Sequence, residues 1–425
     1  MIIKNNFDSI PMKKVSRKLK YDLEKLDPNF ARMMLPWILR NPRYIRAAIR
    51  LMRSVKKAKK MRIEAQANGL LVPPFLIISI TSKCNLFCTG CYAATTGNLY
   101  NKNSKGNTLS KTSLNIEQWR KIISQARELG VIGFVVAGGE PFLYPGLLDL
   151  CEEFKDRLFL ILTNGTAFTK ADFKRLKCLT NLAIIVSVEG GPELTNSRRG
   201  EGVYEKAMNT LTQLNKMGML TGISATITRI NYSYWMDPKL IDDLILQGVR
   251  FGVFIEYIPL TPGIEPDSET PSPSIETIKD KSESEGDTIN WDTKNDHLLM
   301  LTPEERAEFR AQMLNYRETK PIYIVHSPGD EEYFGGCVSA GRGFAHITPV
   351  GDLTPCPVSN IATHNLTTAT LREGLKSHLF EEIRENEHLL ETEGMPCALF
   401  AHPKEVDALA KSVGAYRTSI ERGEV

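Results

Sequence analysis

The sequence predicts an α/β protein with a parallel sheet covered by helices, a helical N-terminal extension and a small C-terminal subdomain. Between residues 70 and 261, short β-rich runs alternate with longer helical patterns, which is typical of a parallel sheet. Residues 1–69 have a helical pattern and are basic, whereas three of the eight cysteines lie within residues 297–425. The length of 425 residues predicts two to three domains.

The N-terminal extension is strongly basic. From Arg40 to Arg62 the chain has ten basic residues and no acidic one, although the net charge of the whole chain is only +3. Four arginines share one helical face beside an apolar flank; they are Arg43, Arg46, Arg50 and Arg53, flanked by Ile45, Ile49 and Met52. Two interpretations stay open: a helix on an anionic membrane surface with Trp37 as an interfacial aromatic, or a solvated face whose other side packs on the catalytic domain. Nucleic acid is not expected, because no aromatic–basic RNA motif is evident.

Six strand-like runs and five helical patterns follow in alternation. The strands are expected near residues 74–80, 131–137, 158–163, 182–188, 220–228 and 249–258, and the helices over 116–129, 145–156, 169–177, 203–217 and 238–247. Because parallel strands end on the same side of such a sheet, functional residues are expected where these strands end.

A cluster of three cysteines follows the first expected strand. Cys84, Cys88 and Cys91 lie within eight residues at the spacing C-x3-C-x2-C. A four-iron cluster normally takes four thiolates, so three leave one iron free to bind a small molecule. The alternatives are a structural zinc site, which would need a further Cys or His, and buried cysteines that lie together by accident.

These residues resemble the signature of the radical S-adenosylmethionine (SAM) superfamily. Gly138, Gly139 and Glu140, followed by Pro141, resemble that family's second motif, GGEP. The resemblance implies a partial, open (β/α)6 barrel in which a [4Fe-4S] cluster binds S-adenosylmethionine. It also implies that the two glycines and Glu140 hold the amino group of the cofactor. The family often has an aromatic residue before the third cysteine, where this chain has Gly90, so Tyr92 or Phe87 is expected to contact the adenine instead.

Polar residues at other strand ends complete the expected cofactor site. Asn164 follows the third strand, and Ser187 and Glu189 end the fourth, where the resemblance implies contacts to ribose hydroxyls. Arg199, next to Arg198, is suited to bind a carboxylate through its planar guanidinium. The alternative for each polar residue is a turn or a helix cap.

Two further segments read as irregular. Residues 262–296 are rich in Pro, Ser and acidic residues and are expected to form a disordered linker. The Asn/Ser/Lys/Gly-rich stretch from Asn98 to Leu114 is either a rim of the active site or disordered. Beyond the linker, Thr302 and Pro303 open a helix as cap and first-turn proline.

The C-terminal segment, residues 297–425, carries a second set of cysteines, Cys337, Cys356 and Cys397. Residues 347–353 read as a hairpin that brings the first two together. The arrangement resembles the truncated auxiliary-cluster subdomain (twitch, related to SPASM) of radical SAM enzymes, which implies one auxiliary [4Fe-4S] cluster. Its fourth position either binds substrate or is closed by His402, and zinc is the alternative occupant.

The two remaining cysteines have no expected partners. Cys151 and Cys178 lie in helical stretches and are expected to be core thiols.

The resemblance implies a reaction in which S-adenosylmethionine is reductively cleaved and hydrogen is removed from a substrate C–H bond. An auxiliary cluster would assist oxidation or bond formation, and no catalytic residue beyond the cluster and cofactor is expected. A low-potential electron donor such as ferredoxin or flavodoxin is implied. Peptide maturation is slightly favoured, with a membrane lipid or a small-molecule cofactor precursor as alternatives. A non-enzymatic iron–sulfur or zinc scaffold is the alternative of another class, although a scaffold would not need the GGEP element.

The sequence also bears on location. No run of about 18 apolar residues appears, so no membrane span is expected. The N-terminus lacks the features of a signal peptide. We therefore expect a cytoplasmic protein in a reducing compartment, with peripheral attachment to a membrane left open.

Overall fold

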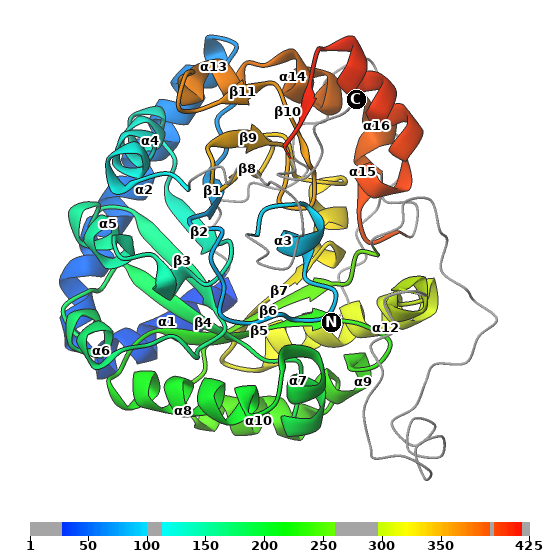
Figure 1. Ribbon diagram of the computed structural model, residues 1–425. Helices are drawn as coiled ribbons and strands as arrows, with labels where there is room; N and C mark the ends of the chain where they lie inside the picture. The colour runs from blue at the N-terminus through cyan, green and yellow to red at the C-terminus, as the bar shows by residue number, and fades with distance from the viewer. Residues whose placement is uncertain (1–27, 100–112, 260–295, 392–394, 419–425) are drawn as a thin grey trace, which may run out of the picture.

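The computed structural model describes the chain over residues 28–99, 113–259, 296–391 and 395–418. Within this part, one ten-stranded sheet with the order β11-β9-β8-β1-β2-β3-β4-β5-β6-β7 forms the centre of the fold (Figure 1). The six predicted strands are confirmed as β1 (Phe75–Ser79), β2 (Gly133–Ala137), β3 (Leu158–Thr163), β4 (Leu182–Ser187), β5 (Thr221–Ile227) and β6 (Phe251–Glu256). They pair in parallel with their neighbours, so the predicted α/β fold with a partial barrel is confirmed.

The predicted helices cover the outer face of this sheet (Figure 1). They are α4 (Ile116–Leu129), α5 (Leu147–Glu153), α6 (Lys170–Leu176), α8 (Val203–Lys216) and α10 (Pro238–Leu246). Three further helices lie between them: η2 (Pro141–Leu143), α7 (Pro192–Arg199) and α9 (Tyr232–Trp235). In α4, Trp119, Ile122 and Ile123 recur at helical spacing and are buried against the sheet. A capping box of Asn115 and Gln118 fixes where this helix begins.

Strands from the C-terminal segment complete both edges of the barrel sheet, which the sequence reading did not anticipate. After η3 (Asp296–Leu299) and α12 (Pro303–Thr319), β7 (Tyr323–Ser327) pairs in parallel with β6. At the other edge, β8 (Phe344–Ile347) pairs in parallel with β1. The predicted hairpin is confirmed, because β9 (Asp352–Thr354) pairs antiparallel with β8. The predicted start of α12 is also confirmed, since Thr302 caps it in a capping box with Glu305.

The rest of the C-terminal segment consists of short elements near β8 and β9. They are η4 (Gly329–Phe334), β10 (Ile361–Ala362), β11 (His364–Asn365), α13 (Leu371–Leu375), α14 (His378–Glu385), η5 (Glu387–Leu390), α15 (Ala398–Ala401), α16 (Pro403–Ser412) and β12 (Tyr416–Arg417). Apolar residues of α13 and α14 belong to the same core as the barrel sheet. The predicted division of the chain into domains stays a prediction.

The basic N-terminal helices lie on the outside of the barrel (Figure 1). They are α1 (Pro28–Arg40), η1 (Pro42–Tyr44) and α2 (Ile45–Ala67). The interpretation of Trp37 as an interfacial aromatic is wrong, because its ring is buried and lies 4.5 Å from that of Tyr44. Two arginines of the predicted basic face bind the barrel: Arg43 donates to the carbonyl of Lys177, and Arg50 to that of Lys155.

Several expectations fall outside the described residues or need correction. Most of the predicted linker and of the predicted active-site rim lies within residues 260–295 and 100–112, which are not described. Cys151 is a buried core thiol, as predicted, but Cys178 is exposed, because it lies in the turn that follows α6. None of the described helices is both long and apolar enough to cross a membrane.

Candidate functional site

The first cysteine triad lies on the loop between β1 and α3 (Tyr92–Thr95), where the predicted site residues were expected to meet. Backbone hydrogen bonds tie this loop to the GGEP segment after β2. The amide of Gly139 donates to the carbonyl of Thr81 at 2.8 Å, and that of Glu140 to the carbonyl of Lys83 at 2.8 Å. A Cβ on Gly139 would lie only 2.0 Å from the Lys83 oxygen, so this close approach requires glycine.

The three thiols of this triad lie close enough to influence one another. Burial, together with the negative charges of Cys88, Glu140 and Cys91, raises the pKa of Cys84 to about 11. Burial also raises the pKa of Cys88, although the charges of Arg199 and Arg198 oppose this shift. Cys84 and Cys88 disfavour their anionic form, so these two thiols need a nearby cation to become thiolates. This donor set therefore fits the cluster that the sequence predicted.

Glu140 lies beneath the cysteine loop and is 1% exposed. Its carboxylate accepts hydrogen bonds from the Thr163 hydroxyl at 2.6 Å and from the backbone amides of Asn164 and Phe142 at 2.8 and 3.1 Å. Burial raises the pKa of Glu140, and these hydrogen bonds oppose the shift. The structure thus brings Glu140 and the end of β3 together, as the sequence predicted.

Asn164 connects the end of β3 to the cysteine loop. Its amide nitrogen donates to Asn85 at 2.9 Å, and Asn85 in turn donates to Thr166 at 2.8 Å. Asn85 is the residue after Cys84, so these bonds fix the loop at its first cysteine. Asn164 therefore has a positioning role toward the cysteine loop, whereas its contact with the cofactor stays a prediction.

A buried ion triad supports the loop from the other side. Glu189, which is 0% exposed, pairs with Arg198 and Arg199. Burial alone would raise the pKa of Glu189, but the charges of Arg198 and Arg199 outweigh it and hold the pKa below its usual value. Arg198 also donates to the carbonyl of Thr89, between the second and third cysteines, at 3.1 Å. The carboxylate that the sequence anticipated for this arginine pair is thus supplied by the chain itself, and ribose binding by Glu189 stays a prediction.

The remaining predicted contacts lie at the same side of the sheet. The hydroxyls of Ser187 and Ser224 are 2.9 Å apart at the ends of β4 and β5. Tyr92 begins α3 and is 37% exposed, whereas Phe87 is 79% exposed on the cysteine loop.

Sequence reasoning missed Tyr257, which follows β6. Gly90 has a φ of +65°, and a Cβ there would lie 3.0 Å from the ring of Tyr257. The Tyr257 ring is 3% exposed and stands where a side chain at position 90 would be. The only available signal was an aromatic residue at a strand end, and its proximity to Gly90 depends on the fold.

The second cysteine triad converges in the C-terminal segment, as the sequence predicted. Burial raises the pKa of Cys337 and Cys356 well above their usual value and that of Cys397 to about 11. The charge of Cys397 adds to the shift of the other two thiols. Sequence reasoning missed Glu331, whose charge acts on all three thiols. Burial raises the pKa of Glu331 itself to about 7.

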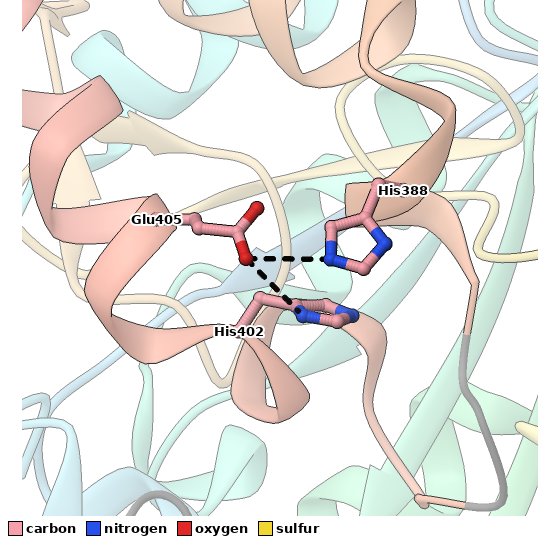
Figure 2. A group of neighbouring side chains, drawn as sticks. All are labelled: His388, His402 and Glu405. Atoms are coloured by element: carbon pink, nitrogen blue, oxygen red, sulfur yellow. Dashed lines mark ion pairs between the residues drawn. The ribbon is translucent and has the colours of Figure 1, made fainter.

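His402, the predicted alternative ligand of this triad, contacts two other side chains. Figure 2 shows it beside His388 and Glu405. Its Nδ1 is 3.8 Å from Glu405, and its ring centroid is 3.9 Å from that of His388. Its Nε2 is buried without a hydrogen-bond partner, so His402 keeps one ring nitrogen that could serve as a ligand.

A chain of hydrogen bonds runs across the sheet from the end of β1 to Cys356 of the second triad. His346 on β8 bonds Ser79 at the end of β1 through Nε2 and Thr354 on β9 through Nδ1, both at 2.8 Å. The Thr354 hydroxyl donates to the carbonyl of Cys356 at 3.1 Å. Burial lowers the pKa of His346 to about 3, so the ring is neutral and donates through one nitrogen only.

Comparisons with known proteins agree with this site. Residues 78–243 match the family profile described as Radical SAM superfamily. The AdoMet-dependent heme synthase of Methanosarcina barkeri is 22% identical over 326 residues, which cover 75% of this chain and 86% of that protein. The mycofactocin maturase MftC of Mycobacterium tuberculosis is 24% identical over 338 residues, covering 76% of this chain and 75% of the maturase.

Solved structures have the same fold. SuiB of Streptococcus suis bound to its precursor peptide SuiA aligns with a TM-score of 0.56 at 17% identity, covering 81% of this chain and 74% of SuiB. The matched domain contains the first cysteine triad, the GGEP segment and the ion triad in one site. Residues 78–243 therefore form a radical SAM domain, and enzymes of this superfamily bind a [4Fe-4S] cluster and S-adenosylmethionine.

Proposed function

We propose that this radical SAM enzyme oxidises a peptide substrate and that the second cysteine triad holds an auxiliary iron–sulfur cluster. The observation that carries the proposal is the convergence of two separate sets of three cysteines, one on the loop after β1 and one in the C-terminal segment. When bound, the family's cofactors supply a carbon radical that can remove hydrogen from an unactivated C–H bond. Net oxidation of the substrate would then require the loss of one hydrogen atom, one electron and one proton, and a cluster held by Cys337, Cys356 and Cys397 would be suited to accept the electron.

The chain's own residues contribute positioning and charge. The backbone of Gly139 and Glu140 holds the cysteine loop from one side, and the ion triad of Glu189, Arg198 and Arg199 holds it from the other. The two arginines favour the thiolate form of Cys88, which a metal requires as a ligand. Such a preorganised loop keeps the three sulfurs in place before any cofactor binds.

The relatives support a peptide as the substrate. The name of MftC describes a maturase, and the PqqA peptide cyclase of Rhizobium meliloti is 23% identical over 326 residues. The solved structure of SuiB contains its precursor peptide. We extend this substrate class to the present chain.

Anaerobic incubation with S-adenosylmethionine, a reductant and short peptides encoded beside the gene tests the substrate. We expect 5′-deoxyadenosine and a peptide product that is lighter by two hydrogen atoms. Replacement of Cys88 by Ala should abolish both. A product that still forms in this variant would contradict the assignment.

A small-molecule cofactor precursor is the second candidate substrate. The heme synthase aligns over 86% of its own length. In addition, residues 28–67 of this chain are helical except near Asn41, whereas a peptide-recognition module of the winged type contains strands. An iron porphyrin precursor in the same assay separates the two candidates. Substrate-dependent 5′-deoxyadenosine with the porphyrin but with no peptide would favour this alternative.

We also propose that α1 and α2 attach the enzyme to an anionic membrane surface. Large apolar side chains are exposed on these helices: Leu35, Leu39, Ile45, Ile49, Met52 and Ile63. On α2 they alternate with exposed basic residues that include Arg46, Arg53, Lys56, Lys57 and Lys60. An exposed face that mixes apolar and basic residues is typical of helices that lie in a membrane interface.

Flotation with vesicles that contain phosphatidylserine tests the attachment. Replacement of Lys56 and Lys60 by Glu should reduce binding, whereas the same charge change at the exposed Lys404 and Lys411 on α16 should not. Equal binding of the two double variants would contradict a role for α2. Binding to neutral vesicles at the same level would contradict the electrostatic part of the proposal.

A further inference from the structure

We propose that Glu331 is the fourth side-chain ligand of the auxiliary iron–sulfur cluster, together with Cys337, Cys356 and Cys397. This inference rests on the auxiliary cluster of the proposed function. It closes the position that three thiolates leave unfilled on a four-iron cluster. It also assigns a task to a buried acidic side chain that the cofactor site around β1 does not use.

The backbone fixes Glu331 next to the first cysteine of the triad. Its amide donates to the carbonyl of Pro328 at 2.7 Å, and its own carbonyl accepts from Gly336 at 3.0 Å. These bonds close a short loop that begins at Glu331 and leads directly into Cys337. The Cys337 amide is then anchored to the carbonyl of Leu390, at the end of η5, at 2.8 Å. Both side chains therefore start from opposite ends of one constrained loop.

The carboxylate of Glu331 lies among the thiols. Its side chain is hydrogen-bonded to that of Cys337. It is near enough to Cys356 and Cys397 for its charge to act on both. Glu331 is 8% exposed, so its ionised form would be stabilised by a cation or a metal. The charge of Arg342 acts on Glu331, and the guanidinium of Arg342 is also bonded to the carbonyl of Cys337.

His402 is the competing ligand, and its contacts point to a different role. Its Nδ1 faces Glu405 on α16, and its ring packs on His388, which is half-exposed (Figure 2). The side chain of Glu331, in contrast, is hydrogen-bonded to the thiol of Cys337, and its charge acts on Cys356 and Cys397. The placement of the two side chains therefore favours the carboxylate as the ligand.

A fourth protein ligand decides between the two tasks open to the auxiliary cluster. A cluster with a free iron can bind the substrate directly, whereas a fully ligated cluster is suited to carry electrons. Three thiolates and one carboxylate leave no position for the substrate. We therefore infer that the auxiliary cluster accepts the electron from the substrate.

The test uses the full-length protein with Cys84, Cys88 and Cys91 replaced by Ala, so that the remaining iron reports only on the second triad. This background is reconstituted with iron and sulfide without oxygen, and iron counting and electron paramagnetic resonance (EPR) are the readouts. We expect about four iron per chain in the background. Adding Glu331→Gln should remove about one iron and give the EPR signal of an oxidised three-iron cluster. Glu331→Cys should have the iron content of the background but a different EPR spectrum of the reduced cluster. His402→Gln should have both the iron content and the EPR spectrum of the background.

The outcomes separate the inference from the proposed function. A background that binds no iron would reject the auxiliary cluster itself. If it binds iron but Glu331→Gln leaves the count and the spectrum unchanged, or if His402→Gln loses the iron instead, the role of Glu331 is refuted and the cluster stands. If the Glu331→Gln variant does not fold, the Glu331→Cys variant provides the test. An EPR spectrum of the Glu331→Cys variant that equals that of the background would also refute the role of Glu331 as a ligand.

Discussion

Replacing Gly139 by Ala should disturb the first cysteine triad more than its small size suggests. The added Cβ would lie 2.0 Å from the carbonyl oxygen of Lys83 and 3.1 Å from the backbone nitrogen of Cys84. Ordinary contact begins at 3.4 Å, so the two backbone segments must separate by about 1.4 Å. Neither neighbour is the flexible end of a side chain, and the hydrogen bond from Glu140 to Lys83 would break as the segments move.

We expect this displacement to reduce activity strongly. A misplacement of about 1 Å at a catalytic site can lower the rate roughly 100-fold. Overpacking of this kind destabilises a fold by about 1–3 kcal/mol. The assay measures iron content and the rate of 5′-deoxyadenosine formation, and both should fall in the variant.

Gly191→Ala is the matched control, because it adds the same methyl group at a φ of −67°, with the nearest atoms of Tyr234 at 3.7 Å. This control should keep the iron content and the rate of the original protein. If Gly139→Ala also cleaved S-adenosylmethionine at the original rate with a full complement of iron, the role assigned to the GGEP backbone would be refuted.

Three further predictions concern other parts of the site. Glu189→Gln leaves two buried arginines without their carboxylate, so the free energy of unfolding should fall by about 3–5 kcal/mol, and an unchanged urea midpoint would contradict this. Burial lowers the pKa of His346 to about 3 from 6.5, so the unfolded chain binds a proton that the folded chain excludes, and stability that is complete above pH 6.5 falls toward pH 3. The His346→Gln variant lacks this pH dependence. Between pH 6.5 and pH 5, the free energy of unfolding, measured by urea titration at each pH, should fall by roughly 2 kcal/mol more in the original protein than in the variant. An equal fall in the two proteins would contradict this prediction. Tyr257→Ala removes the ring next to Gly90 and should weaken binding of S-adenosylmethionine in equilibrium dialysis, while Tyr257→Phe should bind normally; equal affinities would exclude an adenine contact.

The sequence predicted the strands and helices of the barrel closely, because its apolar periodicity is local. It also predicted the residues that meet at the strand ends, since parallel strands end on one side of a sheet. It could not predict that Glu189 would pair with Arg198 and Arg199, because that choice depends on how α7 packs over the cysteine loop.

Long-range strand pairing was also beyond the sequence reading. The apolar runs of β7 and β8 resemble those of any short strand, and their partners β6 and β1 lie far away along the chain. Glu331 had no recognisable motif for the same reason, since its neighbours come from three separate segments. The burial of Trp37 depends on its contact with Tyr44 after the turn between α1 and α2.

The pairing of β8 with β1 has a consequence for the relative placement of the two cysteine triads. His346 lies opposite Ile77 in the parallel register, so the segments leading to the two cysteine triads are held by adjacent ladders of one sheet. A slip of one residue would shift this register by about 3.3 Å and turn every side chain to the opposite face. The spacing between the segments that carry the two cysteine triads is thus tied to the backbone geometry of this sheet.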